Sequence, residues 1–132
     1  MTGVGNVYGE ALYLLAKEED RSKTILEELK VLDESFSQQF EPGAACVKDR
    51  IEALRLLSEH GCKTWVSIEP YPTPNLIEQD LGELLDAVSF ADKIIFGRTN
   101  YSKDVSSYTP HREFYNTCAD EVIDFCTQNN IA

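Results

Sequence analysis

The sequence predicts an α/β fold in which parallel strands alternate with helices. From Val47 onward, segments with helical periodicity alternate with short β-branched and apolar segments, which is the pattern of right-handed βαβ units around a parallel sheet. The two clearest strand-like segments also end in polar residues. The chain has 132 residues and is expected to form one domain, 1–132. It is too short for a complete eight-stranded barrel, which typically needs about 250 residues.

The first third of the chain contains less distinct elements. Ala11–Ala16 is apolar and fits either a short buried strand or the first turns of a helix, because periodicity does not separate the two over this length. Ser22 fits as the N-cap of a helix over Lys23–Leu32. That segment places four apolar residues on one helical face: Ile25, Leu26, Leu29 and Leu32. Asp33–Phe40 is polar and predicts a short helical turn, and Glu41–Ala45 predicts a loop.

The middle of the chain has the clearest pattern. Val47–His60 predicts a helix with one apolar face, and Gly61 supplies the left-handed residue that commonly follows a helix. Cys62–Ile68 is rich in β-branched and aromatic residues and predicts a buried strand. Glu69 and Pro70 are expected to end this strand, because proline has no N–H to donate to a neighbouring strand.

Three further elements complete the alternation. After a proline-rich loop, Leu76–Ser89 predicts a helix with an apolar side. Asp92–Gly97 predicts a second buried strand. A loop through Tyr101–Tyr108 leads to a last helix, predicted over about Arg112–Asn129.

Polar side chains follow both predicted strands. The carboxyl ends of parallel strands meet at one edge of a sheet, so Glu69, Arg98 and Asn100 are expected on one rim. Folds of this class place ligand-contacting groups at that edge. The alternative for Glu69 is structural, since it could cap a neighbouring helix or pair with a surface lysine.

Composition limits the classes of partner. The chain carries 23 acidic and 12 basic residues, a net charge of −11, which argues against nonspecific binding to nucleic acids or to anionic membranes. No apolar run approaches the roughly 20 residues of a membrane span. The first residues lack the basic and apolar regions of a signal peptide, so a cytoplasmic location is expected.

Cysteine and histidine spacing predicts no metal site. The four cysteines form no C-x2-C or C-x3-C pair and are expected to be free thiols, mostly buried: Cys46, Cys62, Cys118 and Cys126. His60 stands at a predicted helix end, where capping is its expected role, and His111 has no spaced ligand partner.

Four parts of the chain carry a family resemblance. They are Phe40–Ala45 with Asp49–Leu54, Gly61–Pro70, Asp92–Tyr101, and Glu113–Tyr115 with Phe125 and Cys126. In this order and spacing, the chain from about Ala11 to Ile131 resembles the later part of a radical S-adenosylmethionine protein of the spore-photoproduct-lyase-like group. The resemblance implies a partial (β/α) barrel that lacks its amino-terminal half.

Two hallmarks of that family are not found in the chain. The C-x3-C-x2-C loop, whose cysteines hold a [4Fe–4S] cluster that binds and cleaves S-adenosylmethionine, is absent. No buried strand is evident between the predicted helix at Lys23–Leu32 and Glu41, because Leu32–Ser37 is short and polar. The resemblance therefore implies a chain that is catalytically incomplete alone. S-adenosylmethionine is a possible ligand, and the cluster enters only if a missing half supplies it.

The resemblance also implies site residues. Ser67 and Glu69 match the strand rim that faces the cofactor, and Arg50 matches a basic position that could meet the cofactor's carboxylate. Gly97 and Asn100 match the next rim, where a small residue lets the backbone approach an adenine or substrate. Further residues expected on the substrate side of the rim are Lys17, Arg98, Tyr71 and Tyr101.

Each of these positions has a structural alternative. Arg50 could instead pair with Glu41 or Glu52 at the surface, and Gly97 could merely end its strand. Asn100 could start a turn. The two tyrosines that follow strand ends, Tyr71 and Tyr101, could stack on a ligand ring or close the barrel mouth.

Three functions are compatible with these observations. The first is a radical-S-adenosylmethionine-like partial barrel that retains part of a ligand-binding rim and awaits a cluster-bearing partner chain. The second is a non-catalytic interaction module whose open sheet edges are covered by a second copy or another partner. The third is an unrelated small α/β enzyme that uses Glu69 as a base, which ranks last because no nucleophile or histidine lies nearby in the sequence.

Overall fold

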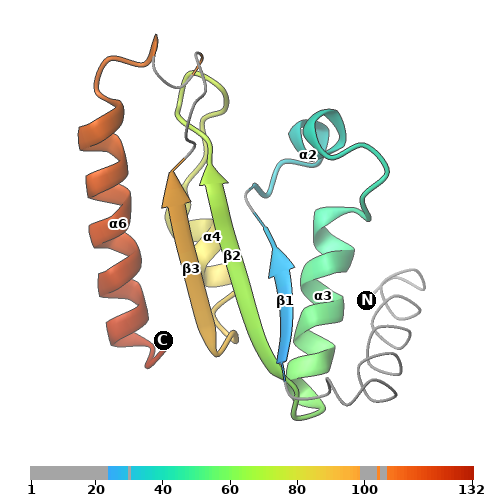
Figure 1. Ribbon diagram of the computed structural model, residues 1–132. Coiled ribbons are helices and arrows are strands. Elements are labelled where there is room, and N and C mark those ends of the chain that lie inside the picture. Colours follow the sequence, from blue (N-terminus) through green and yellow to red (C-terminus); the bar gives the residue numbers. More distant parts are fainter. Residues whose placement is uncertain (1–23, 30, 99–103, 105–106) are drawn as a thin grey trace.

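The structure is a computed structural model that describes residues 24–29, 31–98, 104 and 107–132 (Figure 1). In this part of the chain, three strands form one parallel sheet in the order β1-β2-β3. The elements are β1 (Thr24–Glu28), α2 (Glu34–Phe40), α3 (Val47–Glu59), β2 (Lys63–Tyr71), α4 (Leu81–Ala87), β3 (Lys93–Arg98) and α6 (His111–Gln128). The predicted α/β class, with parallel strands that alternate with helices, is confirmed. The sheet is open, so a partial barrel stays a prediction.

Strand β1 occupies residues that the sequence predicted to be helical, and that prediction was wrong. Its five residues pair in parallel with β2, from Thr24 opposite Lys63 to Glu28 opposite Ser67. The apolar spacing of this segment fits a helix as well as a strand. In the structure Ile25 is buried and its neighbour Leu26 is exposed, as in a strand whose side chains alternate between two faces. Pairing with a strand almost forty residues away decides between helix and strand, and local periodicity does not contain that information. Between Leu32 and Glu41 the described chain forms α2 and no strand, in agreement with the polar sequence there.

The helices that the sequence predicted between residues 33 and 60 are present. The Asp33 side chain accepts a hydrogen bond of 2.7 Å from the Phe36 N–H and so caps α2. Gly61 has a φ of 87° after α3, as expected for the residue that follows a helix. His60 is the C-cap of α3, and its Nδ1 lies 2.7 Å from the Leu56 carbonyl oxygen. The predicted capping role of His60 is confirmed.

Strand β2 continues beyond the predicted stop. It runs through Glu69 and Pro70 to Tyr71, and its pairing with β3 shifts register between Ile68 and Tyr71. The irregularity accommodates the proline, which has no N–H for a regular ladder. Strand β3 lies within one residue of its prediction at each end.

Helix α4 is shorter than predicted. It begins after Asp80, whose side chain accepts a hydrogen bond of 2.8 Å from the Gly82 N–H. The residues before it form a turn instead, in which the N–H groups of Leu76 and Ile77 both donate to the Thr73 carbonyl. The last helix, α6, agrees with its prediction to within one residue at each end. In the described part of the chain, no helix combines the length and apolarity that a membrane crossing requires.

The helices cover one face of the sheet. Figure 1 shows α3 beside β1, α6 beside β3, and α4 behind β2 and β3. Alternate strand residues point toward them and join the core: Ile25, Val66, Ile68 and Ile94. They pack against apolar residues of the three helices, among them Leu54, Leu57, Leu84, Leu85, Tyr115 and Val122. The residues between them, including Leu26, Trp65 and Ile95, belong to the opposite face, and no described helix crosses it (Figure 1).

A matched pair of leucine substitutions tests this arrangement. Leu84→Ala is expected to lower the free energy of unfolding by about 2–4 kcal/mol, because Leu84 is 0% exposed and its loss leaves a cavity. Leu26→Ala is expected to cost less than about 1 kcal/mol, because Leu26 is 53% exposed. Urea denaturation followed by circular dichroism measures both. Equal costs would contradict a core that lies between the sheet and α4 with Leu26 outside it.

Candidate functional site

The carboxyl end of β2 presents the clearest candidate site. Glu69 is exposed there, and its side chain lies directly against Gly97 on the neighbouring strand. A Cβ atom at position 97 would lie 2.9 Å from the Glu69 Cβ and closer still to its carboxylate. Position 97 therefore has to be glycine for the carboxylate to keep its place. Neither the strand-ending role nor the ligand approach that the sequence suggested for Gly97 is needed to explain the residue.

The site belongs to the face of the sheet that no described helix covers, which is called the uncovered face below. Ser67 pairs with Glu28 of β1 and Ile95 of β3, and its side chain alternates with those of the core residues. Ser67 is itself buried, with 4% of its surface exposed. Its carbonyl accepts a 2.9 Å hydrogen bond from the Leu29 N–H, which extends the pairing of β1 and β2 by one residue. In a closed (β/α) barrel, this face would line the interior.

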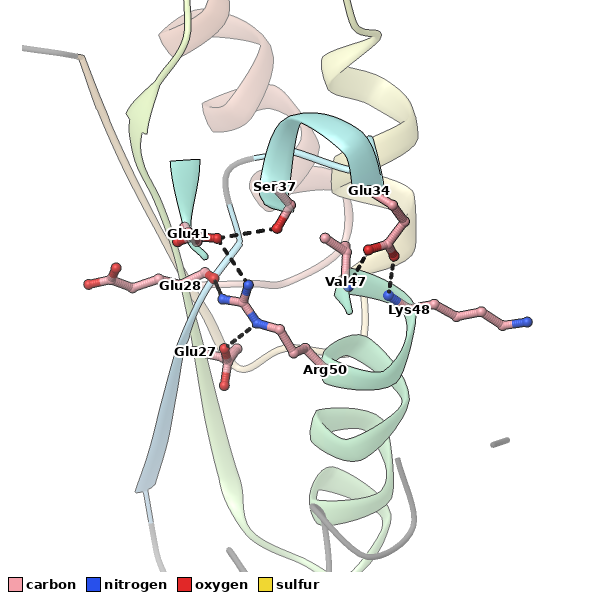
Figure 2. Close-up of polar contacts among 8 residues, drawn as sticks. All are labelled: Glu27, Glu28, Glu34, Ser37, Glu41, Val47, Lys48 and Arg50. Carbon is pink, nitrogen blue, oxygen red and sulfur yellow. Dashed lines mark hydrogen bonds and ion pairs between the residues drawn. The ribbon is translucent and has the colours of Figure 1, made fainter. Parts of the chain in front are cut away.

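Arg50 lies in a separate, buried cluster (Figure 2). Its Nε donates to Glu27 Oε1 at 2.8 Å, its Nη1 donates to Glu41 Oε2 at 3.1 Å, and its Nη2 donates to the Glu28 carbonyl. The Arg50 side chain is only 7% exposed. The alternative that paired Arg50 with Glu41 is therefore what the structure shows, although as a buried contact. Its role toward a cofactor carboxylate stays a prediction.

The charge on Arg50 is maintained by its partners. Burial opposes the charged form, but attraction to Glu27 and Glu41 outweighs it and holds the pKa of the guanidinium above its ordinary value. One planar side chain of α3 thereby joins the last residues of β1 to the start of the loop after α2. The cluster fixes the backbone at this end of β1.

Glu34 holds the other side of the same loop. Its two carboxylate oxygens accept hydrogen bonds from the Val47 N–H at 3.0 Å and the Lys48 N–H at 3.1 Å (Figure 2). These N–H groups belong to the first turn of α3 and have no partner within the helix. A carboxylate at this position is also favoured by the helix dipole. Residues 41–46 are thus fixed at both ends by carboxylates.

Two other predicted rim residues differ in accessibility. Tyr71 is 2% exposed, and its ring stacks on Phe114 with centroids 6.1 Å apart and tilts against Phe96 at 5.4 Å. Burial raises the pKa of the Tyr71 phenol above its ordinary value. The Tyr71 ring is therefore part of the core, and its role at the rim stays a prediction. Arg98 is exposed at the end of β3, beside Tyr71 in the strand pairing.

Three predicted site residues lie outside the described part of the chain: Lys17, Asn100 and Tyr101. The same holds for the ambiguous segment Ala11–Ala16. Their predicted roles stay predictions.

The cysteines do not fit an iron–sulfur cluster. All four are free, and the described residues contain no group of three or more histidine, cysteine or acidic residues that could hold a metal ion. Burial, with a smaller contribution from the charge of Glu121, raises the pKa of the Cys118 thiol to about 11. Burial raises the pKa of Cys62 and Cys126 as well. These thiols are therefore protonated at neutral pH and behave as apolar core groups.

Comparison with known proteins does not identify a family. No protein-family model matches the chain, and no curated protein or solved structure matches it significantly. The site is therefore defined by its geometry alone.

Sequence reasoning missed two structural roles at this end of the sheet. Glu27 was expected on a helix, whereas it lies in β1 and pairs with Arg50. Glu34 was not singled out as a cap, because it lies 13 residues before Val47 and only the folded loop brings them together. The sequence offered one signal for these roles, which is the number of acidic residues near Arg50 in the chain.

The Arg50 cluster is tested by two arginine-to-lysine changes on the same helix. Arg50→Lys is expected to lower the free energy of unfolding by about 2–4 kcal/mol, because an ammonium cannot reach three acceptors with the geometry of a planar guanidinium. Arg55→Lys is the control, since Arg55 is half-buried over the Phe90 ring at 4.9 Å, and its expected cost is below about 1 kcal/mol. Equilibrium denaturation measures the free energy of unfolding of both variants. If the two changes destabilise the protein equally, the Arg50 cluster has no special structural role.

The contact between Glu69 and Gly97 is tested by a double-mutant cycle. Gly97→Ala is expected to destabilise the protein by about 1–3 kcal/mol, because the added methyl group overlaps the Glu69 side chain. In a Glu69→Gly background the same change should cost less than about 1 kcal/mol, since the overlapping atoms are gone. Denaturation of the four chains gives the coupling. A cost that does not depend on residue 69 would show that the two residues do not touch.

Proposed function

We propose that this chain is the later part of a radical-S-adenosylmethionine-like barrel, catalytically incomplete alone, and that it retains a ligand-binding rim. The observation that carries the proposal is the exposed Glu69 carboxylate at the carboxyl end of β2, on the face that the helices leave uncovered. Among the described residues, no hydrogen bond or ion pair engages this carboxylate. Consecutive parallel βα units with polar groups at the carboxyl ends of their strands support the same reading.

The chemistry of S-adenosylmethionine suits an exposed carboxylate. The molecule carries a sulfonium and an α-ammonium group, both positive, and a ribose with two hydroxyl donors. Glu69 can form charge-assisted contacts with any of these. Gly97 contributes by leaving space for the Glu69 side chain. Arg50 enters the proposal as the residue that fixes the end of β1, because three of its donors are already engaged.

This chain's own residues supply no radical chemistry in the proposal. A [4Fe–4S] cluster would deliver the electron that cleaves S-adenosylmethionine, and the cysteines of this chain do not fit one. The cluster would have to come from a partner chain. The function assigned to the present chain is therefore binding and orientation of the ligand.

Calorimetric titration with S-adenosylmethionine tests the proposal. Saturable binding is expected, and Glu69→Gln should weaken it by about tenfold or more, because the amide keeps the shape but loses the charge. Glu59→Gln is the matched control, since Glu59 is exposed at the end of α3 that leads to the start of β2. Absence of binding by a well-folded wild-type protein would refute the proposal, and so would equal binding by all three chains.

A second candidate function is that of a non-catalytic interaction module. The specific observation in its favour is the apolar centre of the uncovered sheet face, where Leu26 is 53% exposed and Trp65 and Ile95 are half-buried. A face of this kind commonly marks a surface that binds another chain. Leu26→Glu would then abolish association in sedimentation experiments and leave the far-ultraviolet circular dichroism unchanged.

A further inference from the structure

The uncovered face of the sheet carries opposite charges at its two ends. Lys63 and Lys93 are the first residues of β2 and β3, whereas Glu69 lies near the other end of β2 and Glu28 ends β1 on the same side. The strand pairing places the apolar residues of this face between these charged ends: Leu26, Trp65 and Ile95. Positive charge, apolar surface and negative charge therefore follow one another along the strands.

Two charged groups on this face, those of Lys63 and Glu69, are available to a partner. Lys63 and Glu69 are both exposed, and within the described residues neither takes part in a hydrogen bond or an ion pair. The Lys93 Nζ lies 4.5 Å from the centroid of the Trp65 ring, so it covers one side of the indole. Its ammonium group therefore lies at the edge of the apolar residues Leu26, Trp65 and Ile95.

We propose that this face binds a second copy of the same chain, related by a two-fold axis that runs across the strands. The inference rests on the second candidate function, the interaction module, and adds the partner and its orientation. Such an axis makes the strands of the two copies antiparallel. Lys63 of each copy then lies opposite Glu69 of the other, so the dimer contains two equivalent Lys63–Glu69 contacts.

The charges favour a two-fold axis across the strands over one along the strands. A two-fold axis along the strands would place Lys63 opposite Lys63 and Glu69 opposite Glu69, which is repulsive. The axis across the strands removes both repulsions and converts them into attractions. On β2 this axis passes near Val66, midway between Lys63 and Glu69, and it sets the large Trp65 of one copy opposite the small Ser67 of the other. Facing sheets pack about 10 Å apart, a distance that paired lysine and glutamate side chains can span.

The size of the face predicts weak association. Three strands at a spacing of about 4.8 Å and four rows of side chains about 6.6 Å apart give a flat area of roughly 400 Å². A partner in a standard protein interface contributes about twice that area. The dimer is therefore expected at micromolar or higher concentrations, and its stability should fall as salt screens the four charges.

Charge reversal tests both the partner and the orientation. Lys63→Glu and Glu69→Lys are made separately, and the self-association of each is measured by sedimentation equilibrium over a range of concentrations without ligand. Each variant alone is expected to associate at least about tenfold more weakly than the wild type, because both contacts across the axis become repulsive. An equimolar mixture of the two variants is expected to regain association, since both contacts then pair opposite charges.

Controls separate this effect from net charge and from folding. Lys48→Glu on α3 and Asp124→Lys on α6 make the same charge changes at exposed positions of the helices, and both should associate like the wild type. Recovery in the mixture also shows that the two interface variants are folded, because misfolded chains would not complement each other.

Two outcomes would overturn the inference. A wild-type chain that stays monomeric at millimolar concentration rules out the dimer, and it leaves the calorimetric test of S-adenosylmethionine binding unaffected. Association that survives either single reversal, or that is lost in the variants and not regained in the mixture, rules out the antiparallel arrangement. The interaction module would then need another orientation or partner.

Discussion

The parallel pairing of β2 with a strand on each side is the constraint on which the rest of the structure depends. β2 exchanges backbone hydrogen bonds with β1 and with β3, and it contributes Val66 and Ile68, both 0% exposed, to the core. Because side chains alternate along a strand, this single pairing decides which residues meet the helices and which face the open side. A shift of one residue would bury Glu69 and expose Ile68.

The sequence was most informative where local chemistry decides the structure. The start and end of α3 follow from its apolar periodicity and Gly61, and β3 follows from a short apolar run with flanking polar residues. It failed at β1, whose apolar spacing fits a helix as well as a strand, because only the distant β2 selects the extended form. It also placed the end of β2 too early, since the register shift that admits Pro70 is a property of the strand pair.

The candidate site was predictable in position but not in the roles of its residues. The rim at the carboxyl ends of the strands follows from the topology, so Glu69 could be singled out from the sequence. Arg50 appeared equally suited to bind an anion, yet two carboxylates and a backbone carbonyl of this chain already engage it. The acidic residues that partner it lie 23 and 9 positions away, and only the folded chain brings them together.

The two proposed uses of the uncovered face share the Glu69 carboxylate, and this makes them thermodynamically linked. A carboxylate that pairs with Lys63 of a second copy cannot at the same time contact the ammonium or ribose of a bound ligand. Ligand binding to the monomer would therefore weaken self-association, and self-association would weaken ligand binding by the same factor. A closed barrel would impose the same choice, because its interior faces the ligand and leaves no room for another sheet. In a closed barrel, the residues Leu26, Trp65 and Ile95 would therefore be covered by the barrel itself. Self-association could cover them only in a chain with an open sheet.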